Sequence, residues 1–270
     1  MGKSLDIIKR VQEHLSYLKS KGYEVVFIAL QGSQNYGLDI YNDEYQSDVD
    51  TKAVILPSFE DFVRNKTPIS TTIVLENNEH IDVKDIRVML DTYKKQNINY
   101  IETLFTKYKI INSKYMDLVE PLFEYREEIA HLNVNQALRC MAGMSMEKLK
   151  AMEHPYPTIK DKIEKYGYDP KQLHHIVRMN QFIHKYASGK SYDKCLIPTQ
   201  EEKDYLLNIK LGKYDLETAR IIAEISDGNT KTIKDLAVTE KDEINQEAIE
   251  ILEKVKCEIL KQRFKEELGL

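Results

Sequence analysis

The chain has 270 residues, of which 42% are hydrophobic and 31% are charged, and its formal net charge is −5. This composition predicts a globular protein whose core is large enough to fold without disulfides. No apolar run approaches the roughly 18 residues that span a membrane, so no membrane partner is expected. The acidic balance argues against long non-specific contacts with nucleic acid, because neutralisation of phosphates drives such binding.

The cysteine pattern and the first residues both indicate a cytoplasmic location. Cys140, Cys195 and Cys257 are isolated, odd in number and never part of a C-x-x-C pair. Such free thiols are typical of a reducing compartment and argue against a zinc site built from cysteines. The segment 1–20 is charged and lacks the apolar run of a signal peptide.

The chain begins with a helical pattern that leads into two strand patterns. Residues 5–20 place apolar side chains at helical spacing. Residues 25–30 (V-V-F-I-A-L) are almost wholly apolar, which is typical of a buried central strand. Residues 48–56 are predicted as the next strand, and their period of two places Asp48 and Asp50 on one face.

The following segment returns to strands before it becomes helical. In the last predicted strand, Asp82 shares a face with His80 and Lys84. Asn99, with Glu102 three residues later, suggests a capping box at the start of a helix. The predicted elements here are a helical turn at 59–63, strands at 70–75 and 80–84 and a helix at 86–97.

From about residue 112 onward the pattern is almost entirely helical. Asp169 followed by Pro170 is a strong helix start, with Asp as N-cap and Pro in the first turn. Residues 188–198 are expected to be a polar connection. Further predicted helices lie at 133–152, 199–208, 216–225 and 244–264.

These elements predict an α+β protein with two domains. Residues 1–111 are expected to form a mixed β-sheet with flanking helices, and residues 112–270 an α-helical domain packed on it. No flexible linker separates the two segments.

The most informative stretch runs from the first strand to the second. Gly32 and Ser33 directly follow the first apolar strand, and Asp48 and Asp50 open the next one. Glycine allows close backbone approach, and free N–H groups beside serine suit the binding of phosphates. Two aspartates side by side repel each other unless a cation lies between them. Asp82, on a later strand, would add a third carboxylate and complete a site for two Mg²⁺ or Mn²⁺ ions.

Isolated motifs of this kind carry little weight, whereas their combination does. A lone D-x-D is usually solvated or caps a helix, and a lone Gly-Ser after a strand is weaker still. An apolar strand, Gly-Ser, a D-x-D strand and a later strand with one central Asp together favour the metal-site interpretation over the solvated one.

This order of motifs resembles the DNA polymerase β-like nucleotidyltransferase superfamily. Within it, the chain is most similar to the YcgL-type predicted nucleotidyltransferases. That branch carries G-S-x-x-Y-G-L before S-D-x-D, as residues 32–38 and 47–50 do here. It also has N-x-N-x-x-E-x-L-F, found at 97–105, and Y-G-Y-D-x-K-x-x-x-H-x-x-R, found at 166–178.

The resemblance implies a two-metal enzyme that moves an NMP from an NTP, such as ATP, to a hydroxyl acceptor and releases pyrophosphate. It implies that residues 1–111 form the catalytic domain, that Asp48 and Asp50 bind both ions, and that Asp82 binds the catalytic ion and orients or deprotonates the acceptor. The residues assigned to the nucleotide are Gly32, Ser33, Tyr36, Ser47, Lys171, His175 and Arg178.

Two of these assignments have simpler alternatives. Lys171, His175 and Arg178 share one face of a helix, which would meet phosphates or the acceptor, or would simply be a solvated face. Tyr36 would stack on a base or pack within its turn. The polar tract 36–46 is longer than in many superfamily members and is the likeliest segment to select the substrate.

Two other functions remain open from the sequence. A D-x-D glycosyltransferase would also use a metal and a nucleotide, but it gives no role to the Gly-Ser turn or to Asp82. A non-catalytic nucleotide sensor, or an antitoxin-like partner protein, would keep the fold without transferring a group. The acceptor is left undefined as an RNA end, a protein or a small molecule.

Overall fold

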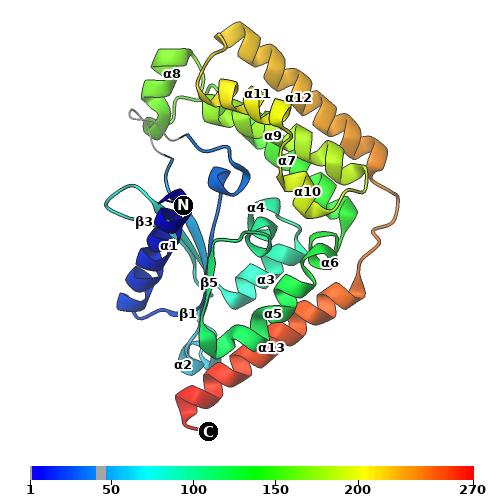
Figure 1. Ribbon diagram of the computed structural model, residues 1–270. Helices are drawn as coiled ribbons and strands as arrows, with labels where there is room; N and C mark the ends of the chain where they lie inside the picture. The colour runs from blue at the N-terminus through cyan, green and yellow to red at the C-terminus, as the bar shows by residue number, and fades with distance from the viewer. Residues whose placement is uncertain (1, 41–46) are drawn as a thin grey trace. The chain divides into compact units, whose positions relative to one another are not determined.

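The computed structural model describes residues 2–40 and 47–270 (Figure 1). The chain divides into two compact units, one formed by Met1–Leu132 with Ile244–Leu270 and the other by Asn133–Glu243. This division differs from the predicted boundary after residue 111. The difference arises because the last helix, α13 (Gln246–Leu268), returns to the first unit and packs there against α3 and α5.

The first unit is built on one mixed five-stranded sheet in the order β3-β4-β2-β1-β5. Strands β2 and β4 are parallel, and every other neighbouring pair is antiparallel. The predicted α+β class with a mixed sheet is therefore confirmed. The strands are β1 (Glu24–Leu30), β2 (Thr51–Leu56), β3 (Ser70–Val74), β4 (His80–Asp85) and β5 (Lys109–Ile111).

The two faces of this sheet differ in chemistry. Helix α1 (Gly2–Ser20) covers one face, and its buried Val11 and Leu18 join a core made by alternate residues of β1, β2 and β4. The parallel register pairs Ala53 with Val83 on that apolar face. The same register pairs Lys52 with Asp82, and alternation of side chains directs this pair to the opposite face.

Helices complete the first unit on the side of the sheet away from α1, as Figure 1 shows for α3 and α5. Burial of Met89, Leu90 and Tyr93 anchors α3 against the sheet, and α13 lies along α3 and α5. These helices are α2 (Phe59–Val63), α3 (Ile86–Lys94), α4 (Ile98–Ile101), α5 (Met116–Glu124) and α6 (Arg126–Ala130), with 3₁₀ turns η1 (Ser33–Tyr36), η2 (Glu102–Leu104) and η3 (Ser113–Tyr115).

The second unit is helical and is organised around α9 (Pro170–Ala187), which packs against four other helices of the unit. The Asp169 side chain accepts a hydrogen bond from the Lys171 N–H at 3.0 Å, so the predicted helix start is confirmed. The remaining elements are α7 (Val134–Ala151), η4 (Pro157–Ile159), α8 (Lys160–Tyr166), α10 (Tyr192–Leu196), α11 (Gln200–Lys210) and α12 (Leu216–Ala237).

Three local predictions are corrected by the structure. Strand β2 begins at Thr51 rather than at Asp48, because the Ser47 and Asp48 carbonyls accept the Gln34 side-chain amide instead of a neighbouring strand. The short strand β5 was not predicted, since three residues give no recognisable period. Helix α10 lies within the segment 188–198 that was predicted to be a connection.

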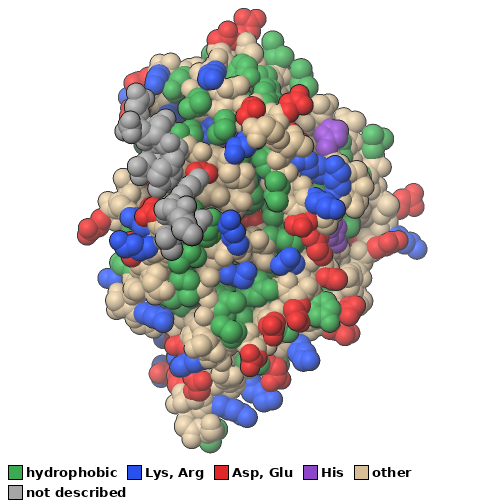
Figure 2. Space-filling view, in the orientation of Figure 1, with side chains coloured by type: hydrophobic (Ala, Val, Ile, Leu, Met, Phe, Trp, Pro, Cys, Tyr) green, Lys and Arg blue, Asp and Glu red, His purple; other side chains and the backbone are tan. Residues whose placement is uncertain are grey.

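No helix among the described residues is both long and apolar enough to cross a membrane. Figure 2 shows acidic and basic side chains interspersed over the visible face. This mixture agrees with the modest net charge of −5.

Candidate functional site

The candidate site lies at the end of the sheet where β1 finishes and β2 and β4 begin. The Gln31 N–H donates to the Asp50 carbonyl at 2.9 Å, which joins the segment after β1 to the segment before β2. Because β2 and β4 are parallel neighbours, their first residues meet at this end. The topology therefore brings Asp50 close to the beginning of β4, the strand that carries Asp82.

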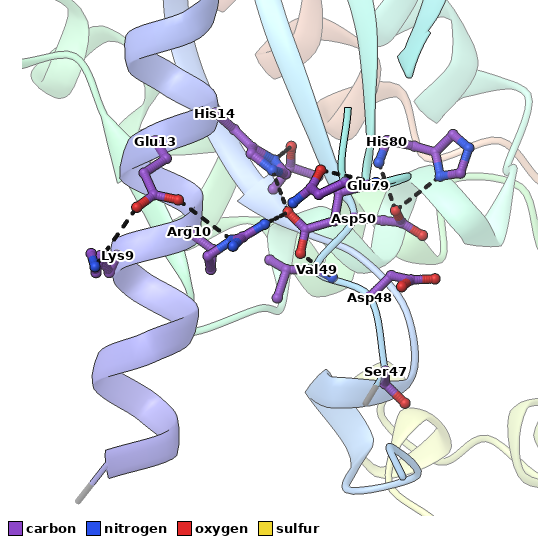
Figure 3. A network of polar contacts seen from close by, with 12 residues as sticks. Lys9, Arg10, Glu13, His14, Ser47, Asp48, Val49, Asp50, Glu79 and His80 are labelled. Atoms are coloured by element: carbon purple, nitrogen blue, oxygen red, sulfur yellow. Dashed lines mark hydrogen bonds and ion pairs between the residues drawn. The ribbon is translucent and has the colours of Figure 1, made fainter. Parts of the chain in front are cut away.

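Asp50 is held by His80, the first residue of β4. Its Oδ1 accepts the His80 backbone N–H at 2.8 Å and the His80 Nδ1 at 3.2 Å. A carboxylate only accepts, so Nδ1 carries the proton in this pair. The imidazole remains 43% exposed, and Figure 3 shows the ring directed away from α1.

The D-V-D segment alternates as predicted although it precedes the strand. Val49 is buried in the core under α1, whereas Asp48 is exposed. Figure 3 shows the carboxylates of Asp48 and Asp50 on the side of the segment away from α1. The two acids therefore face the same side, although both precede β2.

Asp82 is oriented by a tyrosine from the helical layer. The Tyr100 hydroxyl in α4 donates to Asp82 Oδ2 at 2.6 Å, and Lys84 Nζ lies 4.0 Å from Asp82 Oδ1. Burial, together with the adjacent carboxylate, raises the pKa of the Tyr100 hydroxyl well above its usual value, so it remains a donor. Sequence reasoning missed Tyr100, since nothing in its spacing ties it to a strand.

A buried lysine lies among these acids. Lys52 is 5% exposed, donates to Gln31 Oε1, and places Nζ 4.5 Å from the centre of the Tyr100 ring. Burial lowers the pKa of Lys52, while the charges of Glu102, Asp82 and Asp50 act in the opposite direction. The three carboxylates thus favour the ammonium form of Lys52 against the effect of its burial.

The substitution Lys52→Met is expected to lower the free energy of unfolding by about 1–3 kcal/mol, because it removes the donor to Gln31 Oε1 and a positive group near the acids. Urea unfolding at pH 7 would measure the loss. The matched control is Lys95→Met, which removes the same charge from an exposed position on the same unit. Equal stability of the two variants would contradict a compensating role for Lys52.

The Gly-Ser turn is shaped by two glycines with positive φ and by a buried glutamate. Gly32 has φ 89° and ψ −159°, and Gly37 has φ 67°, both in regions that favour glycine. Glu102 accepts the Gly32 N–H at 3.3 Å and the Tyr36 hydroxyl. Tyr36 itself is buried. Its hydroxyl and one N–H of the turn thus bond to the protein's own carboxylate.

The predicted capping box at Asn99 and Glu102 is wrong. Asn97 is the N-cap of α4, and its side chain accepts the Asn99 N–H at 3.1 Å. Glu102 instead follows the helix and reaches the Gly-Ser turn. The glutamate therefore links the N-x-N-x-x-E-x-L-F segment to G-S-x-x-Y-G-L through direct contacts.

Ser47 forms hydrogen bonds with Ile40 at the two ends of the segment 41–46, within the tract that was predicted to select the substrate. Its hydroxyl accepts the Ile40 N–H at 2.9 Å, and its own N–H donates to the Ile40 carbonyl at 2.9 Å. The buried Gln34 amide also donates to the Ser47 and Asp48 carbonyls, a contact that the sequence did not indicate. Residues 41–46 of the tract lie outside the described residues.

The donor set suits a divalent cation, although the side chains are not gathered around one point. Within 2–40 and 47–270, no group of three or more His, Cys, Asp or Glu side chains is arranged to hold a metal ion. Mg²⁺ usually binds one or two carboxylates together with substrate phosphates, so a complete protein cage is not required. Asp50 and Asp82 would supply the first oxygens, and Asp48 would join them by rotating its exposed side chain.

The other predicted nucleotide contacts lie on α9, in the second unit. Lys171 is exposed, and His175 and Arg178 are half-buried. Burial, reinforced by His174, Lys171 and Arg178, lowers the pKa of His175 well below its usual value. His175 is therefore neutral near pH 7, which weakens its predicted role as a cationic contact for phosphate.

The candidate site of the first unit thus combines the Gly-Ser turn, three carboxylates and the buried Lys52. Its supporting residues come from α4, from η2 and from the first residue of β4. A comparison of the chain with protein-family models, curated proteins and solved structures finds no match.

Proposed function

We propose that the chain is a metal-dependent nucleotidyltransferase that transfers an NMP from an NTP to a hydroxyl acceptor and releases pyrophosphate. The observation that carries the proposal is the meeting of Asp50 and the Asp82 strand at the end of the sheet beside the Gly-Ser turn. Carboxylates on adjacent strands, next to a turn with backbone N–H groups, suit a triphosphate bound through divalent cations. The resemblance of the sequence motifs supports the same assignment.

The reaction forms a bond between the acceptor oxygen and the α-phosphorus and breaks the bond from that phosphorus to the pyrophosphate oxygen. A bound Mg²⁺ or Mn²⁺ would neutralise the phosphates and polarise the reacting oxygens. Asp50 and Asp82 would hold the triphosphate through the cation, and Asp48 would complete the ligand set. Asp82 Oδ1 would also orient the acceptor hydroxyl and accept its proton, so catalysis would rest mainly on positioning and charge.

The α9 residues belong to the second unit, and their contact with a nucleotide stays a separate prediction from the sequence resemblance. Lys171 and Arg178 carry the positive charge that phosphates or an acidic acceptor would require. His175 would contribute as a neutral hydrogen-bonding group, given its lowered pKa. The alternative, a solvated helix face, predicts no effect of Lys171→Gln or Arg178→Gln on KM for the NTP.

Label transfer from the full-length wild-type protein tests the proposal directly. The protein would be incubated with each α-³²P-labelled NTP, Mg²⁺ or Mn²⁺, and acceptor mixtures of RNA, protein and small molecules. We expect labelled acceptor, together with one pyrophosphate for each NMP transferred. Tight NTP binding without transfer to any acceptor would contradict catalysis and favour a nucleotide sensor. Binding of UDP-sugars but not of NTPs would instead favour a glycosyltransferase.

A further inference from the structure

A buried polar network lies behind the D-V-D segment, on the side that faces α1. Glu79, the residue before β4, is 7% exposed, and its Oε1 accepts the Val49 N–H at 3.1 Å. Its Oε2 accepts the Arg10 guanidinium and the His14 Nε2, the latter at 2.9 Å. Figure 3 shows these groups converging between α1 and the loop that carries Asp48 and Asp50.

The protonation of this network follows from its contacts. Glu79 only accepts, so His14 Nε2 carries a proton. Burial lowers the pKa of His14, so the ring is neutral near pH 7 and Nδ1 accepts the Thr51 hydroxyl at 2.9 Å. Burial favours the neutral form of Glu79, but the hydrogen bonds from Arg10 and His14 outweigh it and lower the pKa of Glu79. The carboxylate is therefore ionised and bonded through both oxygens near pH 7.

The network accepts a hydrogen bond from the backbone N–H of Val49, the residue between the two predicted metal ligands Asp48 and Asp50. Asp48 and Asp50 precede β2, and on the β1 side the Gln31 N–H holds the Asp50 carbonyl at 2.9 Å. Glu79 holds the Val49 N–H from the α1 side, and the next residue, His80, binds the Asp50 side chain through two donors. Two consecutive residues thus fix both the backbone and one carboxylate of D-V-D.

We propose that Glu79 is a positioning residue that fixes the D-V-D backbone so that Asp48 and Asp50 can bind the cation and nucleotide together. This inference rests on the proposed nucleotidyltransferase function. Groups that orient metal ligands typically change metal affinity by about 10–100-fold when they are removed, which sets the scale of the expected effect. Glu79 lies on the α1 side of D-V-D, away from the Asp48 and Asp50 carboxylates, so its effect would appear in the cation requirement rather than as a complete loss of chemistry.

Glu79→Ala in the full-length protein is expected to raise the Mn²⁺ concentration at half-maximal NMP transfer by about tenfold. Glu79→Gln keeps an oxygen for the Val49 N–H and is expected to restore part of the wild-type Mn²⁺ requirement. Arg10→Gln leaves the bond to Val49 in place, so its Mn²⁺ midpoint should rise less than that of Glu79→Ala. The matched control is Glu76→Ala, which removes the same charge from an exposed position in the same connection.

Thermal unfolding in EDTA, measured on the same variants, separates positioning from simple stabilisation. A purely structural role predicts a lower melting temperature in EDTA with an unchanged Mn²⁺ midpoint, and that result would overturn the inference. If Glu79→Ala does not fold, a Mn²⁺ midpoint for Glu79→Gln equal to that of wild type would overturn it equally. If the wild-type protein shows no Mn²⁺-dependent response to NTPs, the proposed function itself is overturned. If the wild type responds normally and Glu79→Ala has the same Mn²⁺ midpoint, only the positioning role of Glu79 is rejected.

Discussion

Asp82→Asn is expected to reduce NMP transfer by about 10²–10³-fold, the cost of removing one charged group that acts on the transition state. Asparagine has nearly the same shape, and its carbonyl oxygen can still accept the Tyr100 hydroxyl that holds Asp82 at 2.6 Å. The substitution therefore removes the negative charge that would attract the cation and leaves the local packing in place. Single-turnover transfer from an α-labelled NTP at saturating Mg²⁺ would measure the loss.

Two companion variants make this result specific. Asp50→Asn should cause a loss of similar size, because Asp50 faces the same end of the sheet and retains its acceptor for His80. Asp91→Asn removes a carboxylate from an exposed position on α3 and should leave transfer unchanged. Full activity of Asp82→Asn, with the melting temperature of the wild type, would remove the third carboxylate from the proposed site.

A large pH effect on stability is expected from His174 in α9. This side chain is 4% exposed, and its Nε2 has no hydrogen-bond partner among the described residues. Burial, with added repulsion from Arg178, Lys210 and Lys171, lowers the pKa of His174 to about 3. In the unfolded chain His174 has the ordinary histidine pKa of about 6.5. Below that pH the unfolded chain therefore binds a proton at His174, whereas the folded protein does not.

The sign of the pH effect follows from this difference. The stability contributed by neutral His174 is fully present above about pH 6.5 and is lost as the pH falls toward 3. The cost is about 2 kcal/mol at pH 5 and approaches about 5 kcal/mol near pH 3. Urea unfolding of the wild type and of His174→Gln at pH 8 and pH 5 would measure this loss of unfolding free energy. Only the wild type should show it, because the variant lacks the buried imidazole.

The exposed His154 provides the control for this measurement. His154→Gln should show the same fall in stability between pH 8 and pH 5 as the wild type. His175 is retained in all three proteins, but His174 is one of the groups that lower its pKa, so the comparison reports the two neighbouring histidines together. A wild type and a His174→Gln variant that lose equal stability at pH 5 would show that His174 is protonated in the folded protein.

The elements that the sequence predicted well are those with a long or strongly marked pattern. Helix α9 was located by its Asp169-Pro170 start, and β1 by six consecutive apolar residues. The start of β2 was misplaced because the alternation of side chains already begins at Asp48, three residues before the strand itself begins at Thr51. Period alone cannot distinguish a strand from an extended segment held by the Gln34 and Glu79 side chains.

The candidate site shows a similar limit. The acids and the Gly-Ser turn are visible in the sequence because their residue types and spacing are unusual. The residues that support them are not visible in the sequence, because these residues act through contacts between parts far apart in the chain. They are Glu79, Tyr100 and Lys52. The place of α13 in the first unit has the same character, since no local signal in the sequence indicates it.

The contact between Glu102 and the Gly32 N–H has a consequence for how a nucleotide would bind. If a phosphate takes this N–H, it replaces a carboxylate that is already there, so binding is an exchange of anions and gains little from that hydrogen bond. The net affinity would then come from cations, namely Mg²⁺ and the nearby Lys52. The turn would be shaped before any ligand arrives, and nucleotide affinity would depend steeply on the concentration of divalent cation.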